Sequence, residues 1–272
     1  MLLQKVNLAI TKATDLILLP FQMLPPVWGI IWLSLISSFV ILVIFKYLSS
    51  PKKIRREKDR IKAYILAIRI YRDQWLVILE SFVMSLWHTL RYFALNLVPL
   101  AVVLVPLFFL FVQMDIRYGY RAFKEGETAI VKVKLQEGFS PEELSLKKSQ
   151  EGKYKKLITV NIYALGEKNW KVKFISSGNL KFKTSGEEIT KNFTVEERVT
   201  ALSLRKYCRA GLHLLLYPAE PLCNNSDIEY IEIKYPSRSI SFLGIKTHWL
   251  VWYLLFVLII VLALHKRFKI EF

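Results

Sequence analysis

Three long apolar stretches dominate the pattern of the sequence. Residues 26–45 and 92–114 contain no charged side chain, and residues 247–264 contain no Lys, Arg, Asp or Glu, with His248 near their start. A helix needs about 20 mostly apolar residues to cross the hydrocarbon core of a bilayer, and a run of 18 still gives about 27 Å. Runs of this kind leave no polar face for water, which argues against the alternative of buried core helices. We therefore predict three transmembrane helices, over residues 26–47, 92–115 and 247–265.

The segments on either side of the first predicted span have amphipathic patterns. In residues 1–25, apolar residues are interspersed with polar ones such as Lys12 and Asp15, and prolines follow before the span. This pattern is typical of a short helix lying on a membrane surface, and a flexible N-terminus is the alternative. Residues 48–91 combine a basic stretch with a more apolar one, and both place apolar residues near helical spacing. We predict a helical hairpin whose second helix leads directly into the second span.

Residues 116–246 change to an alternation of period two. Val131 and Val133 alternate with Lys132 and Lys134 in TAIVKVKL, and NWKVKF and NLKFKT repeat the pattern. Strand-like runs also occur in LITVNIYAL, GLHLLLY and DIEYIEIKY, with turn residues between them. Short strands with lysines on one face predict an antiparallel β-sandwich that is wet on the lysine side. An immunoglobulin-like topology is one candidate for it.

The distribution of charge predicts the orientation in the membrane. The formal net charge is +17, and residues 46–91 carry eleven Lys and Arg against four Asp and Glu. Short basic loops stay in the cytoplasm, whereas long domains cross the membrane largely regardless of their charge. The hairpin and the basic tail, residues 266–272, therefore both favour a cytoplasmic C-terminus, with the N-terminus and the β-rich segment outside. A basic run rather than a cleavage site follows the first apolar stretch, which argues against a signal peptide.

The predicted fold class is an α-helical membrane protein with a cytoplasmic helical hairpin and an inserted external β-sandwich domain. We expect it in a bacterial inner (cytoplasmic) membrane. The sequence has no catalytic, phosphate-loop or metal-spacing motif, and its four histidines are scattered. We therefore expect no catalytic residue, no metal, no cofactor and no specific nucleic-acid recognition. Cys208 and Cys223 can form one disulfide if their segment faces an oxidising compartment, and the sequence leaves that open.

Polar residues inside or beside the predicted spans are the candidate functional residues. Ser34, Ser37 and Ser38 lie at positions i, i+3 and i+4, hence on one face of the first span. Small residues also permit close helix packing, and cationic residues at span ends can snorkel to lipid headgroups. The functional interpretation is a partly hydrated pocket between the first two spans, open to the cytoplasm. Its other predicted members are Lys46, Arg91, Asn96 and Gln113. A basic cytoplasmic surface is predicted on the hairpin at Lys52, Lys53, Arg55, Arg56, Lys58, Arg60 and Lys62.

The order of these parts resembles the core of the YidC/Oxa insertase superfamily. The resemblance is carried by PFQMLPPVWGIIWLSLISSFVILVIFKYLSSP, by KKIRREKDRIKAYILAIRIYRDQ and by LNLVPLAVVLVPLFFLFVQM. Two features depart from that family. Bacterial-type insertases carry an arginine in the first core span, whereas residues 26–45 carry no charge, and the β-domain here follows the second span instead of preceding the core. The resemblance implies a role in inserting or folding membrane proteins without nucleotide or cofactor.

Two functional hypotheses follow. The first is a non-enzymatic insertase or membrane chaperone, whose partners are membrane lipids, hydrophobic client membrane proteins and the ribosome. The second is a membrane-anchored structural or interaction protein, whose external β-domain binds a protein partner. The two hypotheses differ in whether the three serines and Asn96 face one cavity or face packed neighbours.

Overall fold

The computed structural model describes residues 2–148, 152–184, 187–196, 198–223, 227–265 and 267. The predicted cytoplasmic tail, residues 266–272, lies outside the described residues except for Arg267. The chain divides into two compact units, and each is described by itself. One unit comprises residues 1–30 and 109–252, and the other comprises residues 31–108 and 253–272. We call them the β-unit and the helical unit.

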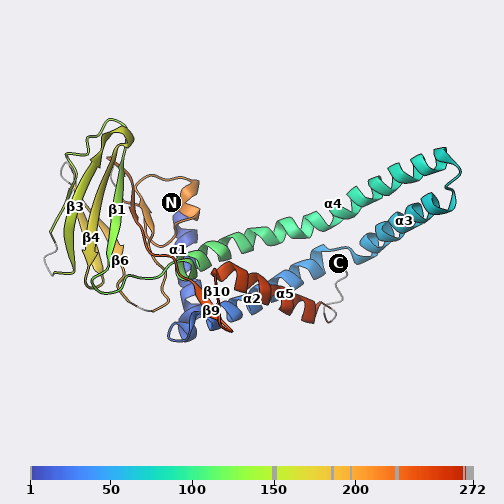
Figure 1. The fold of residues 1–272 in the computed structure, drawn as a ribbon, viewed down its shortest axis with the longest axis horizontal. Helices are drawn as coiled ribbons and strands as arrows, with labels where there is room; N and C mark the ends of the chain where they lie inside the picture. Colours follow the sequence, from blue (N-terminus) through green and yellow to red (C-terminus); the bar gives the residue numbers. More distant parts are fainter. Residues whose placement is uncertain are drawn as a thin grey trace. The chain divides into compact units, whose positions relative to one another are not determined.

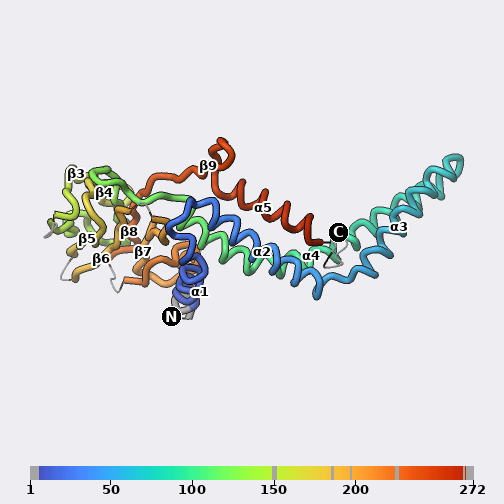
Figure 2. Tube along the Cα trace, turned by 90° about the horizontal axis from the view of Figure 1, so that it is seen from below, coloured from blue at the N-terminus to red at the C-terminus, as the bar shows by residue number. Residues whose placement is uncertain are grey.

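The helical unit contains the predicted hairpin. The helices of the chain that contribute to it are α2 (Pro26–Leu48), α3 (Pro51–Ile70), α4 (Trp75–Met114) and α5 (Trp249–Leu264). Pro51 opens α3, where a missing backbone N–H costs no intrahelical bond. A short turn after α3 then reverses the chain, so that the N-terminal half of α4 runs back along α3 (Figure 1 and Figure 2). The basic and the apolar stretches of residues 48–91 are therefore the two arms of one hairpin.

The second hairpin arm was predicted to lead directly into the second span, and the two form the single 40-residue helix α4. Pro99 and Pro106 lie inside this helix without ending it. By length and composition, α2 and the helix that starts at Trp75 are suited to cross a membrane. At the position of the third predicted span lies α5, an apolar helix of 16 residues.

The β-unit contains an antiparallel sandwich. Its strands are β1 (Thr128–Leu135), β2 (Ser145–Leu146), β3 (Tyr154–Ile162), β4 (Glu167–Phe174), β5 (Gly178–Lys183), β6 (Glu188–Phe193), β7 (Arg205–Tyr207), β8 (Ile228–Ile233), β9 (Ile240–Phe242) and β10 (Ile245–Thr247). The larger sheet has the strand order β3-β4-β1-β8-β7, and a smaller one has the order β2-β5-β6. Strands β9 and β10 form a separate hairpin.

The two sheets share one apolar core. The ring centroids of Trp170 on β4 and Phe182 on β5 are 5.5 Å apart, and those of Phe174 and Phe193 are 4.7 Å apart. The lysines that alternate with these residues, such as Lys171 and Lys181, are exposed. The period-two pattern therefore identified the buried and the wet faces of β1, β4 and β5, because successive side chains of a strand point to opposite sides.

One predicted strand is wrong. The run GLHLLLY forms the 3₁₀ helix Leu212–Leu215 instead of a strand. Its four leucines do not alternate with polar residues, and the backbone carbonyl of Leu214 is bound by Asn7 of α1 (Leu2–Leu18). A strand that the sequence analysis did not name, β6, lies in the smaller sheet and places Lys191 in its buried register between Ile189 and Phe193.

Helix α1 turns its polar face toward the rest of the β-unit. Asn7, Thr11 and Thr14 are buried, whereas Leu8 and Leu16 are exposed. The buried threonine hydroxyls donate back to backbone carbonyls of their own helix, and the amide of Gln113 donates to the hydroxyl of Thr11 over 3.0 Å. A helix on the surface of a soluble protein buries its apolar face and exposes its polar face, whereas α1 does the opposite. Its exposed apolar face is suited to enter a lipid interface.

Candidate functional site

A basic hollow lies where the end of α2, the first turns of α3 and the middle of α4 meet. Its volume is about 640 Å³. The residues that line it are Leu48, Ser50, Lys53, Arg56, Glu57, Arg60, Arg91, Ala94, Leu95 and Val98. We call it the basic hollow. It carries four cationic side chains against one carboxylate, so it attracts anionic groups.

Most of this positive charge is not neutralised within the chain. Glu57 is engaged by His88 at 2.5 Å and by Arg60 at 3.8 Å. Among the described residues, Lys53, Arg56 and Arg91 form no salt bridge. The hydrogen bond with His88 lowers the pKa of Glu57, and the charges of His88, Arg91 and Arg60 lower it further against the effect of burial. Glu57 therefore stays ionised and partly orders the basic residues around it.

Apolar surface adjoins the basic hollow along α4. Ala94, Leu95 and Val98 form its α4 wall. Further exposed apolar side chains follow on the same helix, including Phe93, Leu97, Leu104 and Val105. A ligand that occupies the hollow can thus combine an anionic group with an apolar segment. Such a ligand resembles the end of a hydrophobic helix flanked by acidic residues.

The residues predicted to form one pocket are not all brought together. Arg91 lines the basic hollow, whereas Lys46 is exposed with its ammonium nitrogen 5.9 Å from the ring centroid of Tyr47. Asn96 donates to the backbone carbonyl of Tyr92, one turn earlier in α4. Gln113 belongs to the β-unit, where its side chain contacts Thr11 and Arg117.

The three serines of α2 have different roles. Ser34, Ser37 and Ser38 are all buried. The hydroxyl of Tyr253 on α5 donates to Ser37 over 2.8 Å, and Ser37 donates to the carbonyl of Ser34 over 3.1 Å. The hydroxyl oxygens of Ser34 and Ser38 are buried without a hydrogen-bond partner among the described residues. Ser37 therefore has a packing role, and the other two hydroxyls can still bind water or a polar group.

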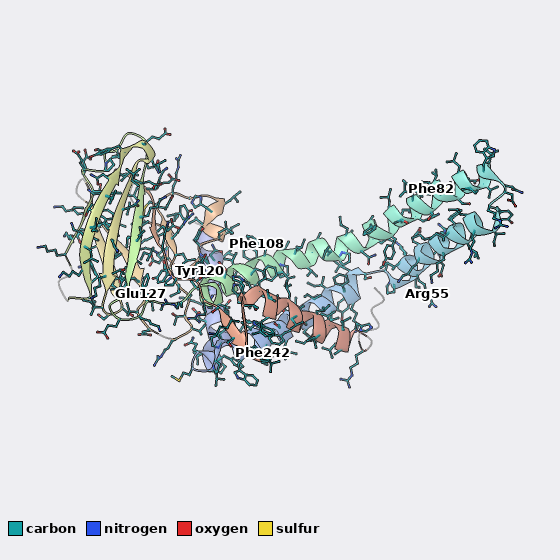
Figure 3. All side chains as sticks on the ribbon, viewed as in Figure 1. Arg55, Phe82, Phe108, Tyr120, Glu127 and Phe242 are labelled. Atoms are coloured by element: carbon teal, nitrogen blue, oxygen red, sulfur yellow. A yellow bond between two sulfur atoms is a disulfide. The ribbon has the colours of Figure 1, made fainter. Side chains whose placement is uncertain are left out.

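The predicted basic surface of the hairpin is exposed at every one of its positions. Lys52, Lys53, Arg55, Arg56, Lys58, Arg60 and Lys62 are all solvent-accessible. A second, shallow hollow of about 600 Å³ is lined by Lys52, Arg55, Arg56 and Arg60 together with Asp59 and Ala63. Arg55 on α3 and Phe82 on α4 mark the basic and the apolar arms (Figure 3). The hairpin therefore offers a positive surface next to a strongly apolar helix.

The pair of Glu57 and His88 was not predicted. The sequence shows only that Glu57 lies in a basic stretch and that His88 lies in an apolar one. Their meeting depends on the register of the hairpin, which the turn and the packing decide. Tyr64 stacks on His88 with ring centroids 5.5 Å apart, so the pair is held from a second side.

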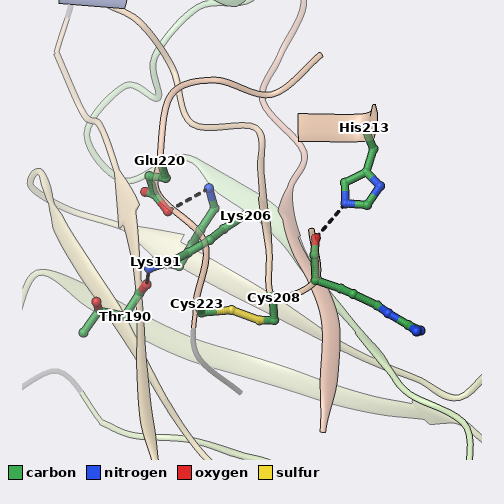
Figure 4. The surroundings of a disulfide bond; sticks show 8 residues. Thr190, Lys191, Lys206, Cys208, His213, Glu220 and Cys223 are labelled. Atoms are coloured by element: carbon green, nitrogen blue, oxygen red, sulfur yellow. Dashed lines mark hydrogen bonds and ion pairs between the residues drawn. A yellow bond between two sulfur atoms is a disulfide. The ribbon is translucent and has the colours of Figure 1, made fainter. Parts of the chain in front are cut away.

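The disulfide region of the β-unit is a second place with unusual chemistry. Cys208 and Cys223 are bonded, with their Cα atoms 4.4 Å apart. Nearby, the fully buried ammonium of Lys191 donates to the carbonyl of Ser203 over 2.7 Å. The same ammonium lies 3.5 Å from Glu220 (Figure 4). Burial lowers the pKa of Lys191 to about 8. Because no part of Lys191 reaches solvent, we interpret this cluster as structural.

Within the described part of the chain, no group of three or more His, Cys, Asp or Glu residues is placed to hold a metal ion. Comparison with known proteins finds no matching family model, no similar curated protein and no similar solved structure. These comparisons therefore indicate no superfamily for the chain.

Proposed function

We propose that this chain is a non-enzymatic insertase or chaperone for membrane proteins, of YidC/Oxa type, in a bacterial inner membrane. In this proposal α2, α4 and α5 cross the bilayer, with the N-terminus and the β-unit outside and the hairpin and C-terminus in the cytoplasm. The observation that carries the proposal is the basic hollow where α2, α3 and α4 meet, because it joins uncompensated positive charge to the apolar surface of α4.

The basic hollow supports capture of a client from the cytoplasmic side. Acidic residues that flank a client helix are attracted to Lys53, Arg56 and Arg91, while the apolar part of the client lies against Ala94, Leu95 and Val98. A single charge at the bilayer centre costs about 3 kcal/mol on insertion scales. A site that keeps water and hydrogen-bond partners close to the client lowers this cost during entry. The unpartnered hydroxyls of Ser34 and Ser38 are suited to that role further along α2.

The short helix α5 supports the same proposal. Its 16 residues give about 24 Å, against about 30 Å of hydrocarbon. A span that is too short is accommodated partly by thinning of the surrounding bilayer. Thinner hydrocarbon shortens the distance over which polar groups of a client must be moved. We therefore expect local thinning to add to the effect of the basic hollow.

The proposal is tested by site-specific photocrosslinking in native membranes. A photoreactive amino acid replaces Leu95, which lines the basic hollow, and in a matched control it replaces Lys62, which is exposed on α3 outside the hollow. Nascent single-span membrane proteins should crosslink at position 95 and not at position 62. Reconstituted protein should also insert such clients into vesicles, and Arg91→Glu should slow acidic clients several-fold. If both positions crosslink equally and insertion does not depend on the protein, the proposal is wrong.

The alternative, an anchored interaction protein, also has an observation in its favour. Strand β3 lies at the edge of the larger sheet and exposes Leu157, Ile158 and Val160. An edge strand with exposed apolar residues is a template for pairing with another chain. A photoreactive group at Ile158 tests this function. Capture of one fixed external partner there, without clients at position 95, would favour the alternative over the insertase.

A further inference from the structure

Another basic hollow lies within the β-unit, next to the start of α2. Its volume is about 590 Å³. The residues that line it are Gln22, Met23, Leu24, Pro26, Arg121, Ala122, Phe123, Lys124, Glu196, Arg198, Val199, Arg238 and Ser239. We call it the junction hollow. Neither the predicted client pocket nor the proposed function uses any of its residues.

The walls of the junction hollow are held by main-chain bonds. The amide of Arg121 donates to the carbonyl of Pro236 over 2.9 Å, and the amide of Arg238 donates to the carbonyl of Gly119 over 2.9 Å. The amide of Phe123 donates to the carbonyl of Thr194 over 3.2 Å. Segments far apart in the sequence thus place their cationic side chains around one space. The hollow is therefore a feature of the fold and does not depend on a single loop.

The charge of the junction hollow is strongly positive. Arg121, Lys124, Arg198 and Arg238 line it, and Glu196 is the one acidic residue among the described lining residues. Arg121 is already bound by both carboxylate oxygens of Glu127, each at 2.8 Å. The side chains of Lys124 and Arg198 are exposed and form no salt bridge with the described residues. The remaining cations can therefore bind an anion that the chain does not supply.

Arg238 is the most informative of these residues. Its Nη1 atom is buried and has no hydrogen-bond partner among the described residues. Burial is the main cause that lowers the pKa of Arg238; the electrostatic interaction with Tyr118 raises this pKa, and the positive charge of Arg121 lowers it. A guanidinium held in this way is destabilised by lost solvation, and an anion next to it offsets that loss. A planar guanidinium is also well shaped for two phosphate oxygens.

The position of the junction hollow indicates what carries the phosphate. Met23 and Leu24 line it and are exposed, and Pro26 is the first residue of α2, which is apolar enough to cross a membrane. Apolar side chains beside a cationic hollow at the end of a span are suited to a lipid, because acyl chains and headgroup are then contacted together. A free phosphate ion has no apolar part that could contact Met23 and Leu24.

We propose that the junction hollow binds the phosphate-bearing headgroup of an anionic phospholipid, with Arg198 and Arg238 as the phosphate ligands. The site is independent of client insertion and requires only that α2 enters the membrane. Lipid bound there fixes the level of the bilayer against the β-unit. Electrostatic attraction alone would not select this place, since exposed lysines also cover the outer faces of the sandwich.

The test uses the full-length protein in a neutral detergent and measures its melting temperature. Dioctanoyl phosphatidylglycerol is titrated in, and dioctanoyl phosphatidylcholine and inorganic phosphate are titrated in parallel. The phosphatidylglycerol should raise the melting temperature in a saturable way at concentrations where the other two do not. Arg198→Gln and Arg238→Gln should each weaken its apparent affinity about tenfold, the effect of losing one good charged contact. Because Arg198 is exposed, Arg198→Gln tests the site even if Arg238→Gln impairs folding.

A matched control removes the same amount of charge elsewhere. Lys155→Gln and Lys171→Gln lie on exposed positions of β3 and β4 and should leave the affinity for phosphatidylglycerol unchanged. An equal loss in this control would mean that only net charge matters, which overturns the proposal. Equal stabilisation by inorganic phosphate that is lost in Arg198→Gln would overturn the assignment to a lipid. Client insertion is measured separately, so failure here leaves the proposed function standing.

Discussion

The imidazole Nδ1 of His88 on α4 lies 2.5 Å from the Oε2 atom of Glu57 on α3, and both side chains are buried. This is a contact between the two arms of the hairpin, next to the basic hollow that Glu57 helps to line. It joins a residue of the basic arm to a residue of the apolar arm. The pair therefore fixes the register of the hairpin and the arrangement of the cations around the hollow.

Removing one partner should loosen the hairpin. We expect Glu57→Gln or His88→Ala to destabilise the contact by about 1.5–3 kcal/mol, the usual size for a hydrogen bond to a charged group. The effect stays below that of a fully enclosed ion pair, because solvent is close on both sides of a two-helix layer. Faster amide hydrogen exchange in α3 of the full-length protein checks this. The double variant Glu57→Leu with His88→Leu should exchange more slowly than either single variant, and equal or faster exchange would contradict a paired role.

The same pair predicts a dependence on acid pH. The folded hairpin lowers the pKa of Glu57 below its usual 4.5. A carboxyl group with a depressed pKa stabilises the fold above its unfolded pKa, and the contribution is lost as the pH falls through the folded value. The protection of α3 amides, corrected for the intrinsic pH dependence of hydrogen exchange, should therefore fall below about pH 4.5 in the wild type, with a much smaller change in Glu57→Gln. An identical acid response in both would show that other groups control the hairpin.

Gly29 and Tyr118 make a close contact in the β-unit. A Cβ atom at Gly29 would lie 2.0 Å from the hydroxyl oxygen of Tyr118, whose side chain is buried. Gly29→Ala should therefore cost about 1–3 kcal/mol, the range for an overpacked site. Thermal melting of the full-length protein measures the loss. Tyr118→Phe in the same chain should restore part of it, because the hydroxyl is the atom in closest conflict. No rescue would mean that the strain lies elsewhere.

Lys191 predicts how the β-unit responds to alkaline pH. Burial lowers its pKa from 10.5 to about 8 in the folded state. Between these values the unfolded chain binds more protons than the folded chain, so this residue makes stability increase as the pH rises from about 8 to 10.5. The melting temperatures of the full-length wild type and of Lys191→Met are measured from pH 7 to pH 10. Between about pH 8 and pH 10, the melting temperature should rise more steeply with pH in the wild type than in Lys191→Met. Parallel curves would show that Lys191 stays charged when buried.

Ser34 and Ser38 should differ from their neighbours in access to water. If their unpartnered hydroxyls face hydrated space, single cysteines at positions 34 and 38 should react with a water-soluble alkylating reagent in native membranes. A cysteine at Leu33, which is equally buried, is the control and should resist modification. Uniform resistance at all three positions would make the serines packing residues, which would remove their part of the insertase proposal.

The sequence by itself determined the elements whose pattern follows from the solvent. Charge-free runs favour apolar surroundings, so α2 and the apolar C-terminal half of α4 were evident as long apolar helices. The lysines of β1, β4 and β5 alternate with apolar residues, so the two faces of those strands were evident as well. The exposure of the seven basic residues that were predicted to form the basic surface of the hairpin follows from the same rule, since a cation is rarely buried without a partner.

The tertiary structure decided the features that depend on which segments meet. The sequence predicted that the second hairpin arm leads directly into the second span, because the apolar pattern continues across Arg91. Only the structure shows that both belong to one helix, which also continues through Pro99 and Pro106. No local pattern identifies Lys191 as a buried residue, because Ser203 and Glu220, which contact its ammonium, come from other parts of the chain. The polar face of α1 meets Gln113 and Leu214, more than 100 residues away, and therefore packs inward. A sequence pattern indicates whether a residue favours apolar or polar surroundings. Only the tertiary structure decides which other residues provide those surroundings.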